Sequence, residues 1–138
     1  MLSVVNIMYS YYFDSSSYFQ QQQNTVQKTS EKNNAARKLC CCICGNPVTS
    51  QDAGCEMDGK HEHTKINPQQ QQYIFRCFSF ASGCELTGLP TLEFTWFTGH
   101  SWRIVRCGQC GTQLGWFFEG ARHFFALICS LLAPCKLN

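Results

Sequence analysis

The chain has 138 residues, a length typical of one domain, and a formal net charge of +2. So small a charge argues against nucleic-acid binding, which usually shows as a basic face or stripe. No stretch reaches the roughly 18 consecutive apolar residues of a membrane-spanning helix, and the apolar start of the chain lacks the basic residues and cleavage site of a signal peptide. We therefore expect one domain that contacts neither nucleic acid nor a membrane. The cytoplasm is the favoured compartment, and secretion stays open.

The first 38 residues are rich in Gln, Ser and Asn, and they include the run Gln20–Gln23. A segment of this composition has too little apolar surface to offset the entropy lost on folding. The sequence therefore predicts a disordered lead-in over residues 1–38 and a folded domain over residues 39–138. A domain that small buries a limited core and is expected to need a stabilising cross-link, such as a metal ion or a disulfide.

Eleven cysteines indicate either a disulfide framework or a metal site. Because the number is odd, complete pairing within the chain is impossible. Two segments share the pattern Cys-x-x-Cys-Gly, in which the two-residue gap lets both thiolates face one tetrahedral ion and the glycine permits a turn beneath it. Four thiolates complete the coordination and leave no open position for catalysis. We therefore predict one structural Zn²⁺ ion, held by Cys41, Cys44, Cys107 and Cys110.

We call each Cys-x-x-Cys-Gly segment a knuckle. Cys40 and Cys42 flank the cysteines of the first knuckle and could compete as ligands, but only Cys41 with Cys44 gives the two-residue gap. The knuckles are separated by residues 45–106, far more than in a compact zinc ribbon. The ion would therefore close a long loop, and its removal should unfold the domain. The remaining cysteines are expected to be buried or loop thiols: Cys55, Cys77, Cys84, Cys129 and Cys135.

Between the knuckles, aromatic and β-prone segments alternate with Gly and Pro, which predicts short antiparallel strands joined by hairpins. Gln69–Gln72 follows Asn67-Pro68 and is expected to form a loop. The apolar residues 123–134 fit a core element. The expected strands are Tyr73–Ala81, Cys84–Thr87, Thr91–Thr95, Ser101–Arg106 and Gln113–Phe118.

The three tryptophans, Trp96, Trp102 and Trp116, all lie close to the second knuckle. Tryptophan is rarely buried completely, because its indole N–H needs a partner. Three of them on neighbouring hairpins either fill the core of a small sheet or form the walls of an open box for a flat or cationic ligand. Composition alone leaves both interpretations open.

Around these tryptophans the chain carries Trp-Phe-x-Gly-x-x-Trp from Trp96, the second knuckle, and Gly-Trp-x-Phe ending at Phe118. These motifs resemble the CULT domain, the thalidomide-binding domain of the cereblon family. Leu39 with the first knuckle, Asn67-Pro68, and the end of the chain up to Pro134 also match. The resemblance covers about one hundred residues and implies a mainly β, zinc-stapled domain of two packed antiparallel sheets (the β-tent fold), as in a stand-alone CULT protein.

The resemblance implies a non-enzymatic, monomeric module that binds cyclic imides or ureas. Candidate ligands are glutarimide-, thalidomide- or uracil-like rings and peptides with an imide end. Trp96, Trp102 and Trp116 would be the walls of a cage, and Phe118 would close its base. The remaining implied contacts are the main chain at Phe94 and Trp96, which would hydrogen-bond the imide, and Asn67 and His100 at the rim.

The chain departs from the family in several places. His100 stands where cereblon carries Tyr, Tyr73 stands near a family His, and the stretch between Trp116 and Phe124 is shorter. Cereblon also has a protease-like domain and a helical segment that docks it to a ubiquitin-ligase scaffold. Residues 1–38 supply neither, so no contact with that scaffold is expected.

Two alternatives use the same residues differently. Methionine sulfoxide reductases share the zinc-bearing fold, but they need an activated nucleophilic cysteine, and neither Cys129 nor Cys135 lies in such a context. The tryptophans could also bind a methylammonium group by cation–π attraction, which would gain from Glu93 or Glu119 nearby.

Overall fold

The computed structural model describes residues 37–136; most of the predicted lead-in lies outside this range. Within it the chain forms nine strands and two short 3₁₀ segments, so the prediction of a mainly β domain is confirmed. None of its helices is long and apolar enough to cross a membrane. The strands are β1 (Lys38–Cys41), β2 (Pro47–Ser50), β3 (Glu62–Ile66), β4 (Gln72–Phe78), β5 (Cys84–Thr91), β6 (Ser101–Cys107), β7 (Gln113–Glu119), β8 (His123–Ile128) and β9 (Leu132–Pro134).

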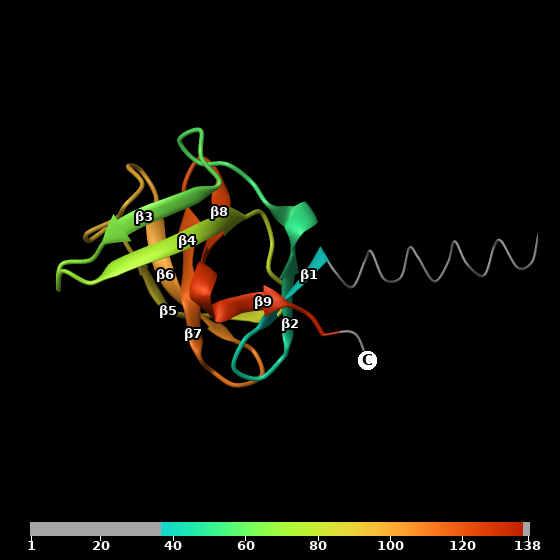
Figure 1. Cartoon of the computed structure of the whole chain (residues 1–138). Coiled ribbons are helices and arrows are strands. Elements are labelled where there is room, and N and C mark those ends of the chain that lie inside the picture. Colours follow the sequence, from blue (N-terminus) through green and yellow to red (C-terminus); the bar gives the residue numbers. More distant parts are fainter. Residues whose placement is uncertain (1–36, 137–138) are drawn as a thin grey trace, which may run out of the picture. The chain divides into compact units, whose positions relative to one another are not determined.

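The strands form two antiparallel sheets, as predicted. One has six strands in the order β3-β4-β8-β7-β6-β5, and the other has three in the order β2-β1-β9 (Figure 1). Residues of both sheets meet in one apolar cluster, which we call the sheet-to-sheet core. Its buried members include Leu39, Val48, Phe78, Val105, Leu114 and Leu127.

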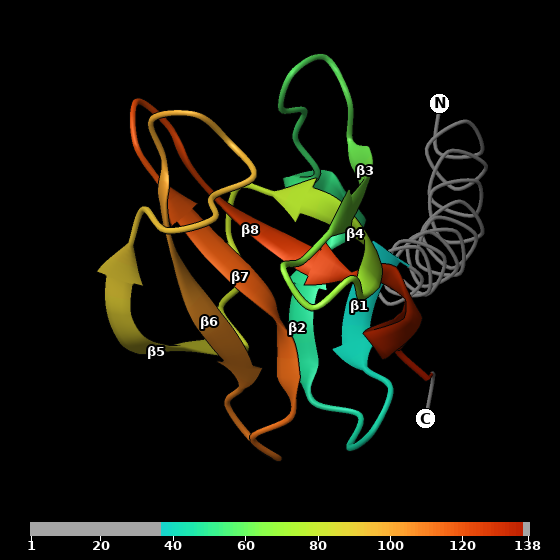
Figure 2. The same cartoon turned by 90° about the vertical axis from the view of Figure 1, so that its left-hand side faces the viewer.

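The other face of the six-stranded sheet carries a second cluster, which we call the aromatic core. The two clusters follow the alternation of side chains along each strand. On β6, Val105 belongs to the sheet-to-sheet core, whereas Trp102 and Ile104 pack against the aromatic core. The sheet is strongly curved (Figure 2). The buried members of the aromatic core include Phe75, Cys77, Phe97, Trp116, Phe118 and Phe124.

The strands predicted after the Gln run agree with the structure with three exceptions. The strand predicted at Tyr73–Ala81 ends at Phe78. The strand expected at Thr91–Thr95 is absent, and β5 instead continues through the Gly-Leu-Pro segment to Thr91. The pairing of β5 with β6 shifts between Thr87 and Thr91, so a bulge accommodates Pro90, whose missing N–H a regular ladder would need. The bulge also leaves Leu89 90% exposed.

Cys40 and Cys135 form a disulfide, with 5.1 Å between their Cα atoms. The expectations that Cys135 is a simple thiol and that Cys40 could compete for metal were therefore wrong. The cause is strand pairing: β9 runs beside β1 and places Ala133 opposite Cys40. The bond joins residues 95 positions apart, so the domain has a disulfide in addition to its predicted metal ligands.

Candidate metal centre and ligand cavity

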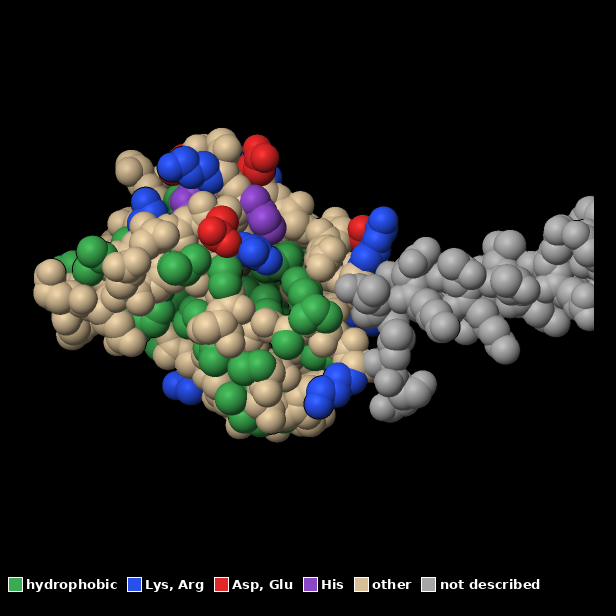
Figure 3. Space-filling view, in the orientation of Figure 1, with side chains coloured by type: hydrophobic (Ala, Val, Ile, Leu, Met, Phe, Trp, Pro, Cys, Tyr) green, Lys and Arg blue, Asp and Glu red, His purple; other side chains and the backbone are tan. Residues whose placement is uncertain are grey.

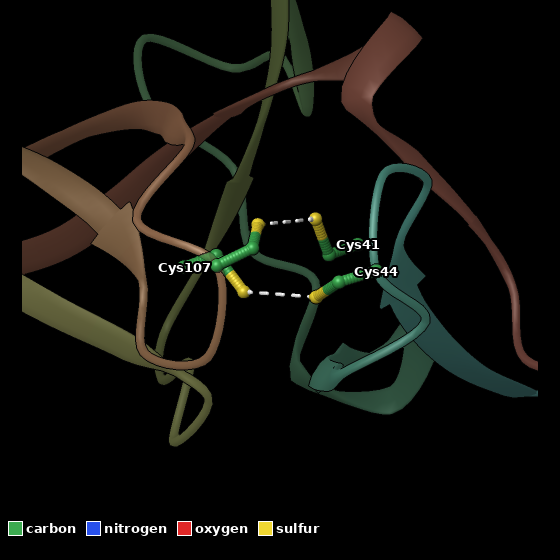
Figure 4. Close-up of side chains that lie close together, drawn as sticks. Cys41, Cys44 and Cys107 are labelled. Atoms are coloured by element: carbon green, nitrogen blue, oxygen red, sulfur yellow. Dashed lines mark hydrogen bonds between the residues drawn. The ribbon is translucent and has the colours of Figure 1, made fainter.

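The four knuckle cysteines come together in space. Their sulfur atoms all lie within 4.8 Å of one another, although 62 residues separate the two knuckles. The Sγ–Sγ distances across the knuckles are 3.7 Å between Cys41 and Cys110 and 3.6 Å between Cys44 and Cys107 (Figure 4). The cluster lies between the turn joining β1 to β2 and the turn joining β6 to β7, which are neighbours in Figure 1.

Each knuckle is a tight turn whose geometry depends on its glycine. Gly45 and Gly111 have φ values of +80° and +75°, in the left-handed region that side chains with a Cβ rarely adopt. The N–H of Gly45 donates to the carbonyl of Cys41, and that of Gly111 donates to the carbonyl of Cys107, at 2.8 and 2.9 Å. The shared glycine of the two motifs is thus explained by the turn that brings each pair of sulfurs together.

The thiols of the second knuckle are the easier ones to ionise. The side chain and N–H of Thr112 lower the pKa of Cys110 to about 6. Burial acts to raise the pKa of Cys107, but the N–H groups of Cys110 and Gln109 outweigh it and lower that pKa. Negative charge is therefore stabilised on this knuckle before any ion binds.

The first knuckle behaves in the opposite way. The N–H of Asn46 acts to lower the pKa of Cys44, but burial and the neighbouring thiols outweigh it and raise the pKa to about 12. Burial likewise raises the pKa of Cys41. Four thiolates this close repel one another, so full ionisation requires a cation among them. Four sulfur donors within 4.8 Å of one another fit a borderline or soft metal ion rather than calcium or magnesium.

A cavity of about 310 Å³ opens beside the aromatic core, at the lower end of the size range of small-molecule sites. Six of the seven predicted ligand-binding residues line it: Asn67, Phe94, Trp96, Trp102, Trp116 and Phe118. Pro68, Gln69, Tyr73, Ile104 and Gln113 complete the lining.

The tryptophans hold their positions through neighbouring aromatic rings and backbone carbonyls. The ring centroids of Trp96 and Trp116 are 4.8 Å apart with the planes nearly perpendicular, and Trp116 is buried. The indole N–H of Trp96 donates to the carbonyl of Ile66 at 3.2 Å, and that of Trp102 donates to the carbonyl of Glu93 at 2.7 Å. Because both indole donors bind backbone oxygens, these two walls offer a ligand mainly their apolar faces.

The connection between β5 and β6 (residues 92–100) forms one side of the cavity. The buried ring of Phe97 anchors it in the aromatic core, and the hydroxyl of Thr95 donates to the carbonyl of His100 at 2.7 Å. Phe94 has a φ of +56°, which is uncommon outside glycine and marks local strain of the kind often found at functional sites. Among the described residues, no hydrogen-bond partner is present for the backbone N–H or C=O of Phe94 or Trp96. The backbone groups of two residues that line the cavity are thus not used by the described part of the fold.

Of the two predicted rim residues, Asn67 lines the cavity and His100 is placed elsewhere. The Asn67 side chain accepts a hydrogen bond from the N–H of Gln71 at 2.8 Å, so its oxygen holds the turn between β3 and β4. His100 does not line the cavity. Its Nδ1 lies 3.0 Å from the carbonyl of Thr98, and its ring packs edge-on against Phe124.

The sequence interpretation missed Ile104 and Gln113. Ile104 could have been found, because it lies two residues after Trp102 and alternation along a strand places both on one face. Gln113 could not. The pairing of β6 with β7 shifts between Val105 and Arg106, because β7 has one extra, bulged residue there. The β7 side chains before the bulge therefore point to the opposite face from the one that strict alternation predicts. That bulge accounts for Gln113 lining the same cavity as Trp116.

The cavity lining is uncharged, since it contains no Asp, Glu, Lys, Arg or His among the described residues. On the face shown in Figure 3, charged side chains cover less of the described surface than hydrophobic side chains, other side chains and backbone do. Aromatic faces, a few amide groups and free backbone groups suit a small neutral ligand that has an apolar body and polar edges.

No protein-family model matches the chain. Cereblon from Gallus gallus is 32% identical over 77 residues, which cover 50% of this chain and 17% of that protein. Cereblon from Drosophila erecta is 35% identical over 79 residues, 53% of this chain and 12% of the relative. Cereblon from Danio rerio is 33% identical over 75 residues, 50% of this chain and 17% of the relative. The chain thus spans less than a fifth of these relatives' length. The described domain is thus similar to part of cereblon, and its two-sheet fold and four-cysteine cluster agree with that similarity.

Proposed function

We propose that this domain is a non-enzymatic module that binds a small neutral cyclic imide or urea between its three tryptophans. The ligand class comprises glutarimide-, thalidomide- and uracil-like rings, either free or at the end of a modified peptide. We further propose that the metal is a structural Zn²⁺ ion, because four thiolates in tetrahedral spacing are the usual donor set of such sites.

The observation that carries the proposal is the pairing of apolar walls with free backbone groups at the rim. An imide ring has methylenes that pack on indole faces, and an N–H and two carbonyls that need partners once they leave water. The unpartnered N–H and C=O groups at Phe94 and Trp96 are donors and acceptors of the required kind. Tyr73 and Gln113 add polar side chains to the same lining.

An enzymatic role as a methionine sulfoxide reductase is less well supported. Burial raises the pKa of Cys129, and its Sγ lies 3.8 Å from a carboxylate oxygen of Glu62, so the thiolate that catalysis needs is disfavoured. Cys135, the other candidate nucleophile, is bonded to Cys40.

A methylammonium ligand is also less well supported. Cation-binding cages gain from a nearby carboxylate, and neither Glu93 nor Glu119 lines the cavity. The carbonyl of Glu93 instead accepts the Trp102 indole N–H, so its role in the described residues is to position a wall.

The test is a titration of the metal-loaded protein with glutarimide, uracil and tetramethylammonium, followed by intrinsic Trp fluorescence. We expect saturable quenching by the imide and no response to the cation. Response to the cation alone would overturn the proposal in favour of a methylammonium site. No response to any of the three from folded, metal-loaded protein would mean that the tryptophans serve the core.

Three variants sharpen the test. Trp102→Ala removes one wall that is only half-buried, so it should weaken imide binding at least about tenfold, equivalent to about 1.4 kcal/mol, and leave the fold intact. Phe94→Gly keeps the backbone groups at a φ that glycine tolerates and should retain most of the affinity. Leu89→Ala changes an exposed apolar residue outside the cavity and is the matched control.

A further inference from the structure

Cys55 and Cys77 lie opposite each other across an antiparallel backbone contact. The N–H of Cys55 donates to the carbonyl of Cys77 at 2.9 Å, and the N–H of Ser79 donates to the carbonyl of Ala53 at 2.8 Å. These two hydrogen bonds flank the bridge between Gly54 and Phe78. Cys55 and Cys77 therefore adjoin this bridge, one on each segment, and share one backbone hydrogen bond, while the N–H of Cys77 donates to the carbonyl of His61 at 2.9 Å. Paired residues such as Gly54 and Phe78 have Cα atoms about 4.5–5.5 Å apart, so the adjoining cysteines start near the roughly 4.4–6.8 Å that disulfides span.

The two thiols also lie on the same side of the backbone. Cys77 is fully buried in the aromatic core, and Cys55 is half-buried and packs against that same cluster. Burial raises the pKa of Cys77 to about 12, and the nearby thiol of Cys55 adds to the rise, as expected of close neighbours. Two opposed cysteines on one face are placed to react with each other.

We propose that Cys55 and Cys77 form a second disulfide of this domain when a small-molecule disulfide such as oxidised glutathione is present. The thiolate of Cys55, the more exposed of the two, attacks one sulfur of the oxidant and releases one reduced thiol. Cys77 loses its proton and attacks the Cys55 sulfur of the mixed disulfide, which releases the second reduced thiol. The cysteine pair thus gives up two electrons and two protons, and the oxidant takes up both.

The surroundings of the pair favour a bond that forms slowly and persists. Few thiolates are available to start the exchange, because burial raises the pKa of both Cys55 and Cys77. For the same reason Cys77 is a poor leaving group, and its burial keeps external thiols away from its sulfur. The existing bond between Cys40 and Cys135 shows that this fold accommodates disulfides.

The bond would enclose residues 56–76, which include β3 and the turn between β3 and β4. That turn supplies Asn67, Pro68 and Gln69 to the cavity rim, and Cys77 shares the aromatic core with Trp116 and Phe118. The oxidation state of the pair would therefore change how firmly one rim of the cavity is held.

The test uses the full-length, metal-loaded protein, incubated in glutathione buffers of graded ratio of oxidised to reduced form. Free thiols are then trapped with iodoacetamide, and cysteine pairs are mapped by peptide mass spectrometry. We expect a peptide pair joined through Cys55 and Cys77, lighter by two hydrogen atoms than the separate peptides. The thermal midpoint of the oxidised protein should also rise relative to the reduced protein.

Cys55→Ser is the preferred variant because Cys55 is not fully buried. It should abolish the rise in thermal midpoint that oxidation of this pair causes. Cys129→Ser, which changes another half-buried thiol, should leave the rise unchanged. Complete alkylation of Cys55 and Cys77 while Cys40–Cys135 stays bonded would overturn the proposal. Pairing of Cys55 with any other cysteine would also overturn it.

Discussion

Gly115 allows β7 and β8 to approach each other, and Gly115→Ala tests how much the cavity depends on that approach. A Cβ at this position would lie 1.9 Å from the carbonyl oxygen of Ala126, a backbone atom that cannot rotate away. Real Cβ atoms essentially never come closer than 3.0 Å, so the strands must separate by at least 3.0 − 1.9 = 1.1 Å. Trp116 is the next residue and pairs with Ala126 itself.

The expected cost combines two effects. Forcing atoms into a packed site costs about 1–3 kcal/mol, and weakening one or two ladder hydrogen bonds adds about 0.5–1.5 kcal/mol each. Gly115→Ala should therefore lower the free energy of unfolding by about 1.5–6 kcal/mol. It should also weaken ligand binding in the protein that remains folded, because Trp116 moves with its strand.

The assay is urea denaturation of the metal-loaded protein, followed by far-UV circular dichroism so that the change around Trp116 does not affect the signal. Gly88→Ala is the control. Gly88 has a φ of +74° but no neighbour within 4 Å of the added Cβ, so only the backbone penalty of about 1–2 kcal/mol applies. If Gly115→Ala is no more destabilising than Gly88→Ala, the close approach of the strands does not control stability and the reasoning is refuted.

Three further predictions concern the cysteines. Cys107→Ser should lose both the metal and the fold, as measured by metal analysis and circular dichroism. The control variant Cys129→Ser should lose neither. A folded, metal-loaded Cys107→Ser protein would contradict a structural role for the ion. Cys135→Ser should lower the free energy of unfolding by up to about 4–5 kcal/mol, the value expected for a closed loop of this length. The double variant with Cys40→Ser should be only slightly less stable than the single variant, because both lack the same one bond. Burial raises the pKa of Cys84 from 9.0 to about 12, so above pH 9 the unfolded state releases a proton that the folded state keeps. Stability should then fall between pH 9 and 12, and more shallowly in Cys84→Ala; equal slopes in alkaline denaturation series would refute this.

The parts of the site that the sequence predicted depend on local spacing. A two-residue gap and a following glycine specify a knuckle wherever the knuckle lies, so all four cysteines of the cluster were identified. The strands β4, β6 and β7 carry long β-prone runs and were also found. In contrast, β1, β2 and β3 have five residues or fewer and weak patterns, and they are held by their partners rather than by their own propensities.

The parts that were missed depend on contacts between distant segments. The pairing of Cys40 with Cys135 follows from β9 lying beside β1, which no local pattern indicates. Gln113 reaches the cavity through a bulge in the pairing of β6 with β7. His100 lies outside the cavity because a turn directs its ring toward Phe124. For Gln113 and His100, the direction of the side chain is set by backbone irregularity rather than by residue type.

The adjacent positions of Cys40 and Cys41 have a mechanical consequence. Cys40 is bonded to Cys135 near the other end of the domain, while Cys41 belongs to the cluster that holds the hairpin of β6 and β7. A pulling force applied between Lys38 and Lys136 would pass through the disulfide, a covalent bond that bypasses the 94 residues between its two cysteines. The six-stranded sheet and its cavity would carry almost none of that load. Tension on the flanking chain would then leave the tryptophan walls undistorted until the bond itself is reduced.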